Sequence, residues 1–102
     1  MSRVRLAERS VLVLTSLAAG DRHGYALIKD IESFSGVALS PGTLYGALAK
    51  LEADGFVQRL PADDRRHPYR LTPSGRAALA ERLAESARIA SLGLERIALG
   101  GR

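Results

Sequence analysis

The side chains best suited to chemistry are a set of hydrogen-bond donors and cations in the middle of the chain. Thr43 and Tyr45 carry hydroxyl groups, and Lys50 carries a positive charge a little further along. Groups of this kind donate hydrogen bonds to phosphate oxygens and to base edges. Arg65 and Arg66 stand in a polar turn, where arginines can enter a minor groove or clamp the backbone beside it. These residue types favour double-stranded DNA as the partner.

Catalytic and metal chemistry has much less support. The 102 residues include no Cys, which excludes a disulfide, a thiolate nucleophile and a Cys-ligated zinc site. His23 and His67 lie far apart in the sequence without further metal ligands at suitable spacing, so no metal and no other cofactor is expected. The sequence also lacks a glycine-rich phosphate loop and a serine set between glycines after a strand. We therefore expect a protein that is not an enzyme.

The composition indicates a soluble, cytoplasmic protein. Hydrophobic residues make up 46% of the chain and charged residues 25%, as in ordinary globular proteins. The longest apolar run, residues 11–14, is far shorter than the roughly 20 residues that span a bilayer. Its flanks do not resemble a signal peptide, and the lack of Cys suits a reducing compartment. No contact with a membrane is expected.

Hydrophobic periodicity predicts two helices ahead of the hydroxyl-bearing residues. Residues 5–19 place Leu6, Val13 and Leu17 on one helical face, although residues 11–14 alone could also form a buried strand. Residues 25–34 carry a clearer apolar stripe. Tyr25 opens this second helix, and its ring either packs at the edge of the core or contacts DNA.

A third helix is predicted over residues 41–54, with Ser40 as its N-cap and Pro41 at its first position. Its leucines fall on one side, whereas Gly42 and Gly46 fall on the other, where solvated helices usually carry Glu, Lys or Gln. Each glycine costs about 1 kcal/mol relative to Ala inside a helix. An outer face this small indicates that another surface comes close to it.

Two strands, residues 56–60 and 67–71, are predicted to form a hairpin, and a last helix is predicted from residue 73 to about residue 98. Apolar residues in this helix alternate at spacings of three and four, which is the seam of helices that pack on a partner. The seam either meets a second subunit or folds back on its own domain, and Gly93 weakens the helix near its end. We expect a homodimer interface made of Leu6, Val13, Leu17, Ala80, Leu83, Ala87, Ala90, Leu94 and Ile97.

This order of elements is that of a winged helix-turn-helix with an appended C-terminal dimerisation helix, a mainly α fold with a small β-hairpin (α+β). We expect the DNA-binding domain to occupy residues 1–72, and the dimerisation helix and tail to occupy residues 73–102. In helix-turn-helix proteins the second helix of the pair enters the major groove while the first braces it. Residues 41–54 are therefore expected to read DNA, braced by residues 25–34.

Several motifs resemble the PadR family of bacterial transcriptional regulators. They are His23-Gly24-Tyr25, Ser40-Pro41-Gly42-Thr43-Leu44-Tyr45 and Tyr69-Arg70-Leu71-Thr72-Pro73-Ser74-Gly75. The resemblance implies a dimeric repressor of the short type with a single dimerisation helix, a palindromic operator, and release by a small-molecule effector. The expected effector pocket lies between residues 6–17 and the partner's last helix. With the small helix face included, the expected DNA-binding residues are Tyr25, Ser40, Gly42, Thr43, Tyr45, Gly46, Lys50, Arg65 and Arg66.

The net charge of +4 adds little to this prediction. Residues 40–71 carry five basic and four acidic side chains, a net charge of +1, so the reading surface is barely basic. Arg3 and Arg5 are candidates for a second phosphate contact. An alternative for Arg65 and Arg66 is a solvated turn whose charge is cancelled by Asp63 and Asp64. The alternative for the whole chain is a winged-helix module that binds protein instead of DNA.

Overall fold

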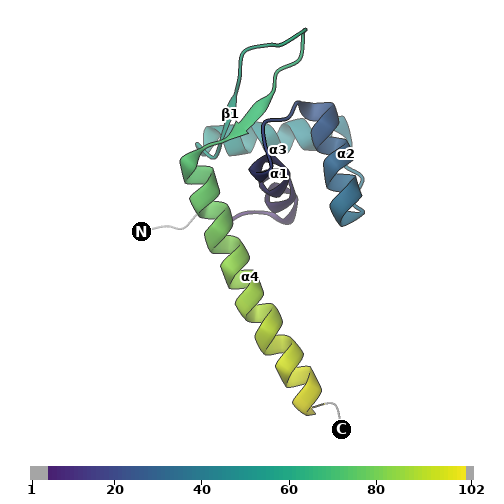
Figure 1. Ribbon diagram of the computed structural model, residues 1–102, viewed down its shortest axis with the longest axis vertical. Coiled ribbons are helices and arrows are strands. Elements are labelled where there is room, and N and C mark those ends of the chain that lie inside the picture. The colour runs from purple at the N-terminus through teal and green to yellow at the C-terminus, as the bar shows by residue number, and fades with distance from the viewer. Residues whose placement is uncertain (1–4, 101–102) are drawn as a thin grey trace.

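The computed structural model describes residues 5–100, which form four helices and a two-stranded hairpin. In chain order they are α1 (Glu8–Ala18), α2 (Gly24–Ser35), α3 (Pro41–Ala53), β1 (Val57–Arg59), β2 (Tyr69–Leu71) and α4 (Pro73–Gly100). Helices α1 to α3 gather into one body, the hairpin projects from one end of it, and α4 runs away in the opposite direction (Figure 1). This is the mainly helical winged fold expected from the sequence.

The elements differ from the predicted ones mainly at their ends. α1 is a helix rather than a strand, and it begins at Glu8 instead of residue 5. The strands pair antiparallel and are shorter than predicted, because Pro68 has no N–H with which to extend the ladder. The Leu60 N–H still donates to the Pro68 carbonyl at 2.8 Å. The two arms of the hairpin are therefore hydrogen-bonded one pair beyond the strands.

The hydrophobic core lies where the first three helices meet the hairpin. Leu14, Leu27 and Leu48 are fully buried in it, which confirms the predicted apolar faces of these helices. Val13 and Leu17 are core residues as well, with 0% and 2% of their surface exposed. The prediction that Val13 and Leu17 line a dimer interface is wrong, because their own domain already covers them.

The first turn of α4 is tied to the end of α3. The Thr72 hydroxyl donates to the Gly55 carbonyl at 2.7 Å and accepts from the Gly75 N–H at 3.0 Å. Gly75 packs so closely that a Cβ atom there would lie 2.0 Å from the carbonyl oxygen of Phe56. This contact requires glycine, and it fixes the direction in which α4 leaves the body.

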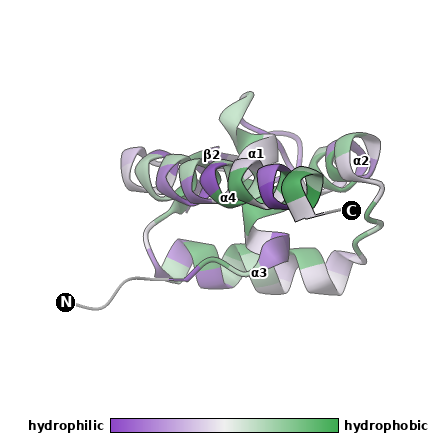
Figure 2. Ribbon diagram, turned by 90° about the horizontal axis from the view of Figure 1, so that it is seen from below, coloured by the Kyte–Doolittle hydropathy of each residue, from purple (hydrophilic) through white to green (hydrophobic). Residues whose placement is uncertain are grey.

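Beyond that turn α4 is a single helix that continues through Gly93. It is about 42 Å long at 1.5 Å per residue and gives the chain a longest dimension of 58 Å. Its buried residues are Gly75 and Leu79, whereas Leu94 and Ile97 are 69% and 70% exposed. Apolar and polar residues alternate along α4 (Figure 2). Since its apolar residues near the C-terminal end are exposed, the seam does not fold back on its own domain. None of the helices in residues 5–100 has the length and apolar composition needed to cross a membrane.

Candidate nucleic-acid interface

The N-terminus of α3 is organised by Ser40 and Thr43. The Ser40 hydroxyl accepts a hydrogen bond from the Thr43 N–H at 3.2 Å and donates one to the Thr43 hydroxyl oxygen at 3.0 Å. The prediction of Ser40 as the N-cap of α3 is thus confirmed. Because the Thr43 hydroxyl oxygen accepts in this pair, the Thr43 hydroxyl proton is available to donate to another acceptor. Ser40 is a positioning residue, and Thr43 is the better donor to a ligand.

The outer face of α3 is open. Gly42 and Gly46 are exposed, and a Cβ atom on either would meet nothing within 4 Å. Packing within the chain therefore does not require glycine at these two positions. Lys50 follows on α3, where its ammonium group lies 3.4 Å from Asp54 Oδ2. This ion pair is exposed to solvent and weak, so a phosphate can replace Asp54 as the partner of Lys50.

Two tyrosines stand where α2 and α3 meet. The Tyr45 hydroxyl lies so close to Gly24 that a Cβ atom at Gly24 would be 2.2 Å from it. Glycine at this position lets the Tyr45 ring lie across the start of α2. Tyr25 is 64% exposed, and the Lys29 ammonium lies 5.3 Å from its ring centroid. The alternative in which Tyr25 packs in the core is therefore wrong.

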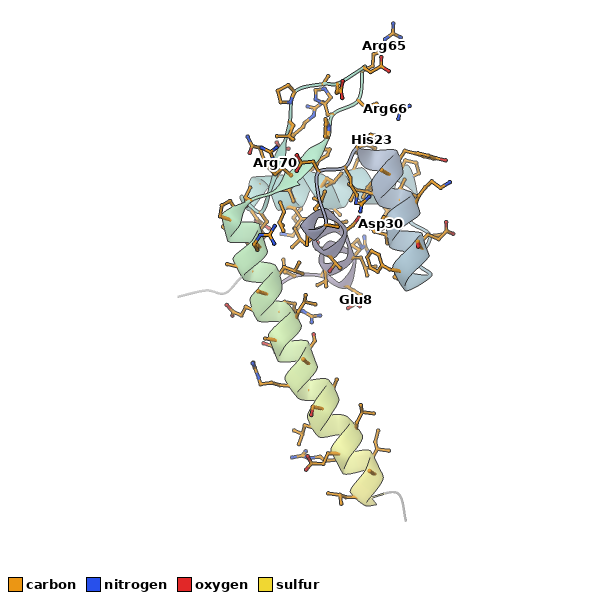
Figure 3. The ribbon with its side chains drawn as sticks, in the orientation of Figure 1. Glu8, His23, Asp30, Arg65, Arg66 and Arg70 are labelled. Atoms are coloured by element: carbon orange, nitrogen blue, oxygen red, sulfur yellow. The ribbon has the colours of Figure 1, made fainter. Side chains whose placement is uncertain are left out.

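The tip of the hairpin is a tight turn that projects Arg65 away from the body (Figure 3). Asp63 and Arg66 close the turn with backbone hydrogen bonds of 2.7 and 3.1 Å, and Asp64 and Arg65 between them have φ angles of 53° and 69°. This left-handed region costs a residue with a side chain about 1 kcal/mol. Within residues 5–100 neither arginine forms an ion pair with Asp63 or Asp64. The guanidinium groups of the turn are thus not held by the two carboxylates beside them, although the four charges of residues 63–66 sum to zero.

The hairpin is fixed to the body through the turn between α1 and α2. Arg22 and Tyr69 exchange backbone hydrogen bonds of 3.2 and 2.8 Å, so this turn is joined to β2 by an isolated antiparallel β-bridge. Arg70 on β2 donates to both carboxylate oxygens of Asp21, at 3.2 Å to Oδ1 and 2.8 Å to Oδ2, and these hydrogen bonds raise the pKa of the Arg70 guanidinium. No local spacing links residue 21 to residue 70, which is why sequence reasoning missed both contacts.

A hollow of about 520 Å³ lies between α2, α3 and the hairpin. It brings together four of the residues predicted to bind DNA, namely Tyr25, Tyr45, Arg65 and Arg66. Sequence reasoning did not select the other residues that line it, which are His23, Gly24, Arg59, His67 and Tyr69. Although two histidines line this hollow, no group of three potential metal ligands occurs in the part of the chain that the structure describes.

Comparison with protein families matches residues 13–81 to the transcriptional regulator PadR-like family. The match contains all of α2, α3 and the hairpin, together with the start of α4. The chain belongs to this family. The resemblance drawn from the three motifs is thereby confirmed, and the family consists of transcriptional regulators rather than enzymes.

Two relatives are similar to this PadR-like chain in sequence. An uncharacterized 37.1 kDa protein in transposon TN4556 of Streptomyces fradiae is 49% identical over 83 residues, which is 81% of this chain and 24% of that protein. Transcriptional regulator Rv3488 of Mycobacterium tuberculosis is 44% identical over 72 residues, which is 68% of this chain and 66% of that protein. The chain thus spans about a quarter of the first relative and about two thirds of the second.

A solved structure confirms the PadR-like fold. The crystal structure of a PadR family transcription regulator from hypervirulent Clostridium difficile R20291 is 23% identical to this chain. The two superpose with a TM-score of 0.81, over 89% of this chain and 99% of that one. The arrangement of helices and wing is therefore shared, whereas this degree of identity carries no information about the operator.

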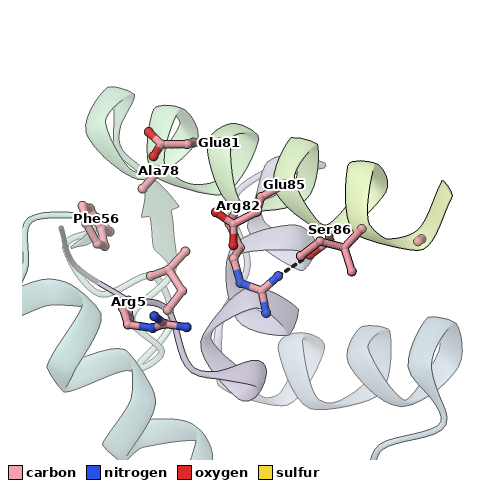
Figure 4. Close-up of a pocket in the computed structure, with 10 residues that line it drawn as sticks. Arg5, Phe56, Ala78, Glu81, Arg82, Glu85 and Ser86 are labelled. Carbon is pink, nitrogen blue, oxygen red and sulfur yellow. Dashed lines mark hydrogen bonds between the residues drawn. The ribbon is translucent and has the colours of Figure 1, made fainter. Parts of the chain in front are cut away.

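A groove of about 700 Å³ lies beside α4 in this PadR-like chain, where the segment before α1 and the end of α3 approach it (Figure 4). Arg82 donates a hydrogen bond to Ser86 there, and its guanidinium lies 3.7 Å from the Glu8 carboxylate. Leu6 and Arg5 line the groove. Arg3, the other residue expected to contact phosphate, lies outside the described residues. The groove combines apolar and charged walls, unlike the hollow beside the hairpin.

Proposed function

We propose that this PadR-like chain is a transcriptional repressor that binds a palindromic DNA operator as a homodimer. The observation that carries the proposal is the outer face of α3, where Gly42 and Gly46 stand in open space. Gly46, in the interior of α3, costs about 1 kcal/mol of helix stability relative to Ala, and packing within the chain requires glycine at neither position. A ligand surface that comes close to the helix backbone accounts for both glycines.

The major groove of DNA suits this face in size and in chemistry. The groove is about 12 Å wide and a helix with its side chains is about 10–12 Å across, so α3 enters most easily where its side chains are smallest. Thr43 and Lys50 then reach phosphate oxygens or base edges along that face. The hairpin extends beside α3, which brings Arg65 to the adjacent minor groove.

The exposed seam of α4 supplies the surface that joins two copies. Leu83, Leu94 and Ile97 are 43%, 69% and 70% exposed in the single chain, and a second α4 in antiparallel or crossed contact removes them from water. Ala80, Ala87 and Ala90 continue this seam, and Leu6 adjoins it at the groove. In a two-fold dimer the two α3 helices lie about 34 Å apart, which is one turn of duplex.

We place a small-molecule effector in the groove beside the chain's own α4, rather than between residues 6–17 and the partner's last helix. Its volume of about 700 Å³ lies in the range of about 300–1,000 Å³ that small ligands occupy. Because α4 forms one wall, a ligand there changes the angle between α4 and the body, and with it the distance between the two α3 helices. An effector releases the operator if it binds more tightly to a dimer whose two α3 helices are not spaced by one turn of duplex.

Fluorescence anisotropy with a labelled duplex from the promoter of its own gene tests this function. We expect binding to this duplex to be at least about 1,000-fold tighter than to random duplex, and to weaken steeply as salt rises, because bound phosphates release counterions. Equal affinity for the two duplexes contradicts sequence-specific binding. Light scattering during size-exclusion chromatography is expected to report a dimer at micromolar concentration, and a monomer contradicts the proposed assembly.

A module that binds another protein is the second candidate function. It is favoured by Leu92 and Leu99, which are 46% and 62% exposed and lie on a different side of α4 from the seam. The triple variant Lys50→Ala, Arg65→Ala, Arg66→Ala separates the two functions in cells. Repression is lost in this variant if the chain acts on DNA, and cellular function is unchanged if it acts through protein contacts alone.

A further inference from the structure

The hollow between α2, α3 and the hairpin contains side chains that the proposed contacts of α3 with the major groove do not use. Three arginines, two histidines and three tyrosines line its volume of about 520 Å³, and no carboxylate of the described residues does so. Apart from Gly24, every lining residue carries a polar or positively charged side chain. Guanidinium groups and hydroxyls donate strong hydrogen bonds to anions. The hollow therefore matches an anionic ligand rather than an apolar or cationic one.

Backbone pairing assembles this hollow. Arg59 and Tyr69 face each other across the ladder between β1 and β2, and Tyr69 also pairs with Arg22, the residue that precedes His23. The strand register thus brings Arg59, Tyr69 and His23 to one place. Burial raises the pKa of the Tyr69 phenol, which keeps this hydroxyl in its neutral, hydrogen-bond-donating form.

The positive charges of the hollow lack carboxylate partners. Within residues 5–100 no ion pair involves Arg59, Arg65 or Arg66, in contrast to the arginine on β2, which is bonded to Asp21. Arg66 instead donates to Nε2 of His23 at 3.2 Å, across the gap between hairpin and α2 (Figure 3). A charged oxygen is a stronger acceptor for a guanidinium than a neutral imidazole. An anion that enters the hollow therefore displaces this contact.

The start of α2 opens into the same hollow. No side chain caps the N-terminus of α2, and the residues of its first turn that line the hollow are Gly24 and Tyr25. The first N–H groups of a helix have no partner within the helix and carry a partial positive charge that suits phosphate. Donors thus surround one space from α2, from β1 and from the hairpin.

We propose that this hollow is a phosphate-binding site that takes one backbone phosphodiester of the DNA strand crossing between α3 and the hairpin. The inference rests on the proposed DNA binding and adds the place at which the strand is held. Arg59 and Arg66 donate to the phosphate oxygens, and the hydrogen bond from Arg66 to His23 is broken when the phosphate binds. Because α3 and the hairpin border the same hollow, one fixed phosphate sets the register of α3 along the major groove.

Single-phosphate neutralisation tests this assignment. A series of operator duplexes, each with one methylphosphonate in place of a phosphodiester, is titrated by anisotropy with the full chain, with Arg59→Gln and with the matched control Arg88→Gln on α4. We expect one position per half-site whose neutralisation weakens binding about tenfold. Arg59→Gln weakens binding to the unmodified operator by a similar factor and loses all sensitivity to that position, whereas Arg59→Lys recovers part of it. Arg88→Gln keeps the wild-type profile, and circular dichroism melts confirm that each variant folds.

The outcomes separate this inference from the function on which it rests. If the chain binds its operator specifically but no methylphosphonate position is coupled to Arg59, the phosphate site is refuted while the proposed function stands. If no duplex is bound specifically, the proposed function itself fails. A second arm titrates inorganic phosphate against the free protein at constant ionic strength, observing the His23 ring by NMR. We expect no saturable shift below about 10 mM, because one free anion lacks the other DNA contacts. Saturation at lower concentration overturns the assignment to a DNA strand and indicates that the hollow binds a free phosphate compound.

Discussion

Replacement of Gly46 separates the stability of α3 from the use of its outer face. Gly46 lies in the interior of α3, is exposed, and has nothing within 4 Å of the position that a Cβ atom takes. Gly46→Ala therefore adds no clash within the chain and removes the conformational cost of glycine. We expect the free energy of unfolding to rise by about 1 kcal/mol, which corresponds to a rise in Tm of about 4–8 °C for a domain of this size.

Substitutions at Gly46 are also expected to weaken DNA binding, and the loss of affinity is expected to increase with the size of the new side chain. If α3 lies in the major groove with Gly46 against the duplex, a methyl group forces a small displacement and the longer side chain of Gly46→Gln a larger one. Overpacking of a close-fitting contact costs roughly 1–3 kcal/mol, so Gly46→Gln is expected to bind the operator about 5- to 150-fold more weakly. Glutamine is a good helix former, and this variant still melts above the wild type.

Thermal melts by circular dichroism and operator titrations by anisotropy measure the two effects on the same samples. Ala84→Gln is the matched control, because Ala84 is exposed on α4, far along the chain from α3. We expect this control to keep wild-type DNA affinity. A Gly46→Gln protein that is stabilised and also binds the operator as tightly as the wild type would refute the reasoning, since no surface then approaches the glycine face.

Other substitutions have outcomes that follow as directly from the contacts. Gly75→Ala is expected to lower the free energy of unfolding by about 3 kcal/mol in denaturant titrations, because its Cβ would lie 2.0 Å from the Phe56 carbonyl oxygen and backbone cannot give way; a loss below about 0.5 kcal/mol contradicts the packing described. Gly24→Ala meets only the end of the Tyr45 side chain, at 2.2 Å, so Tyr45 swings aside; stability is expected to change by less than about 1 kcal/mol while operator affinity falls several-fold. An unchanged affinity means that the placement of Tyr45 is unimportant for DNA. Ile97→Glu puts a charge on the exposed seam and is expected to convert the dimer to a monomer in light scattering, with a parallel loss of operator affinity; a dimer that persists excludes the seam as the interface.

Local signals predicted α3 well. Ser40 and Pro41 specify the start of α3 because a hydroxyl cap and a proline at the first position both satisfy the helix without any distant partner. The apolar face of α3 followed from spacing alone, and burial of Leu44 and Leu48 confirms it. These features depend on neighbours along the chain, which a sequence displays.

Features that depend on distant pairing could not be read in the same way. Periodicity showed that Val13 and Leu17 share an apolar face, but it did not show whether that face packs on its own domain or on a partner. Nor did the sequence distinguish Gly75, which packs against backbone, from Gly46, which stands in open space. The hollow arises only when the register of β1 and β2 brings Arg59 opposite Tyr69, so no local signal showed that its residues would lie together.

Selection of bound DNA tests the central claim, that α3 and the hairpin read a duplex, most directly. Purified protein is incubated with a library of random duplexes at physiological salt, and the retained fragments are sequenced. The account predicts enrichment of an inverted repeat whose half-sites are centred about 10 base pairs apart, one turn of duplex, as two α3 helices on one face require. Retained fragments with no sequence shared beyond the input library would contradict it.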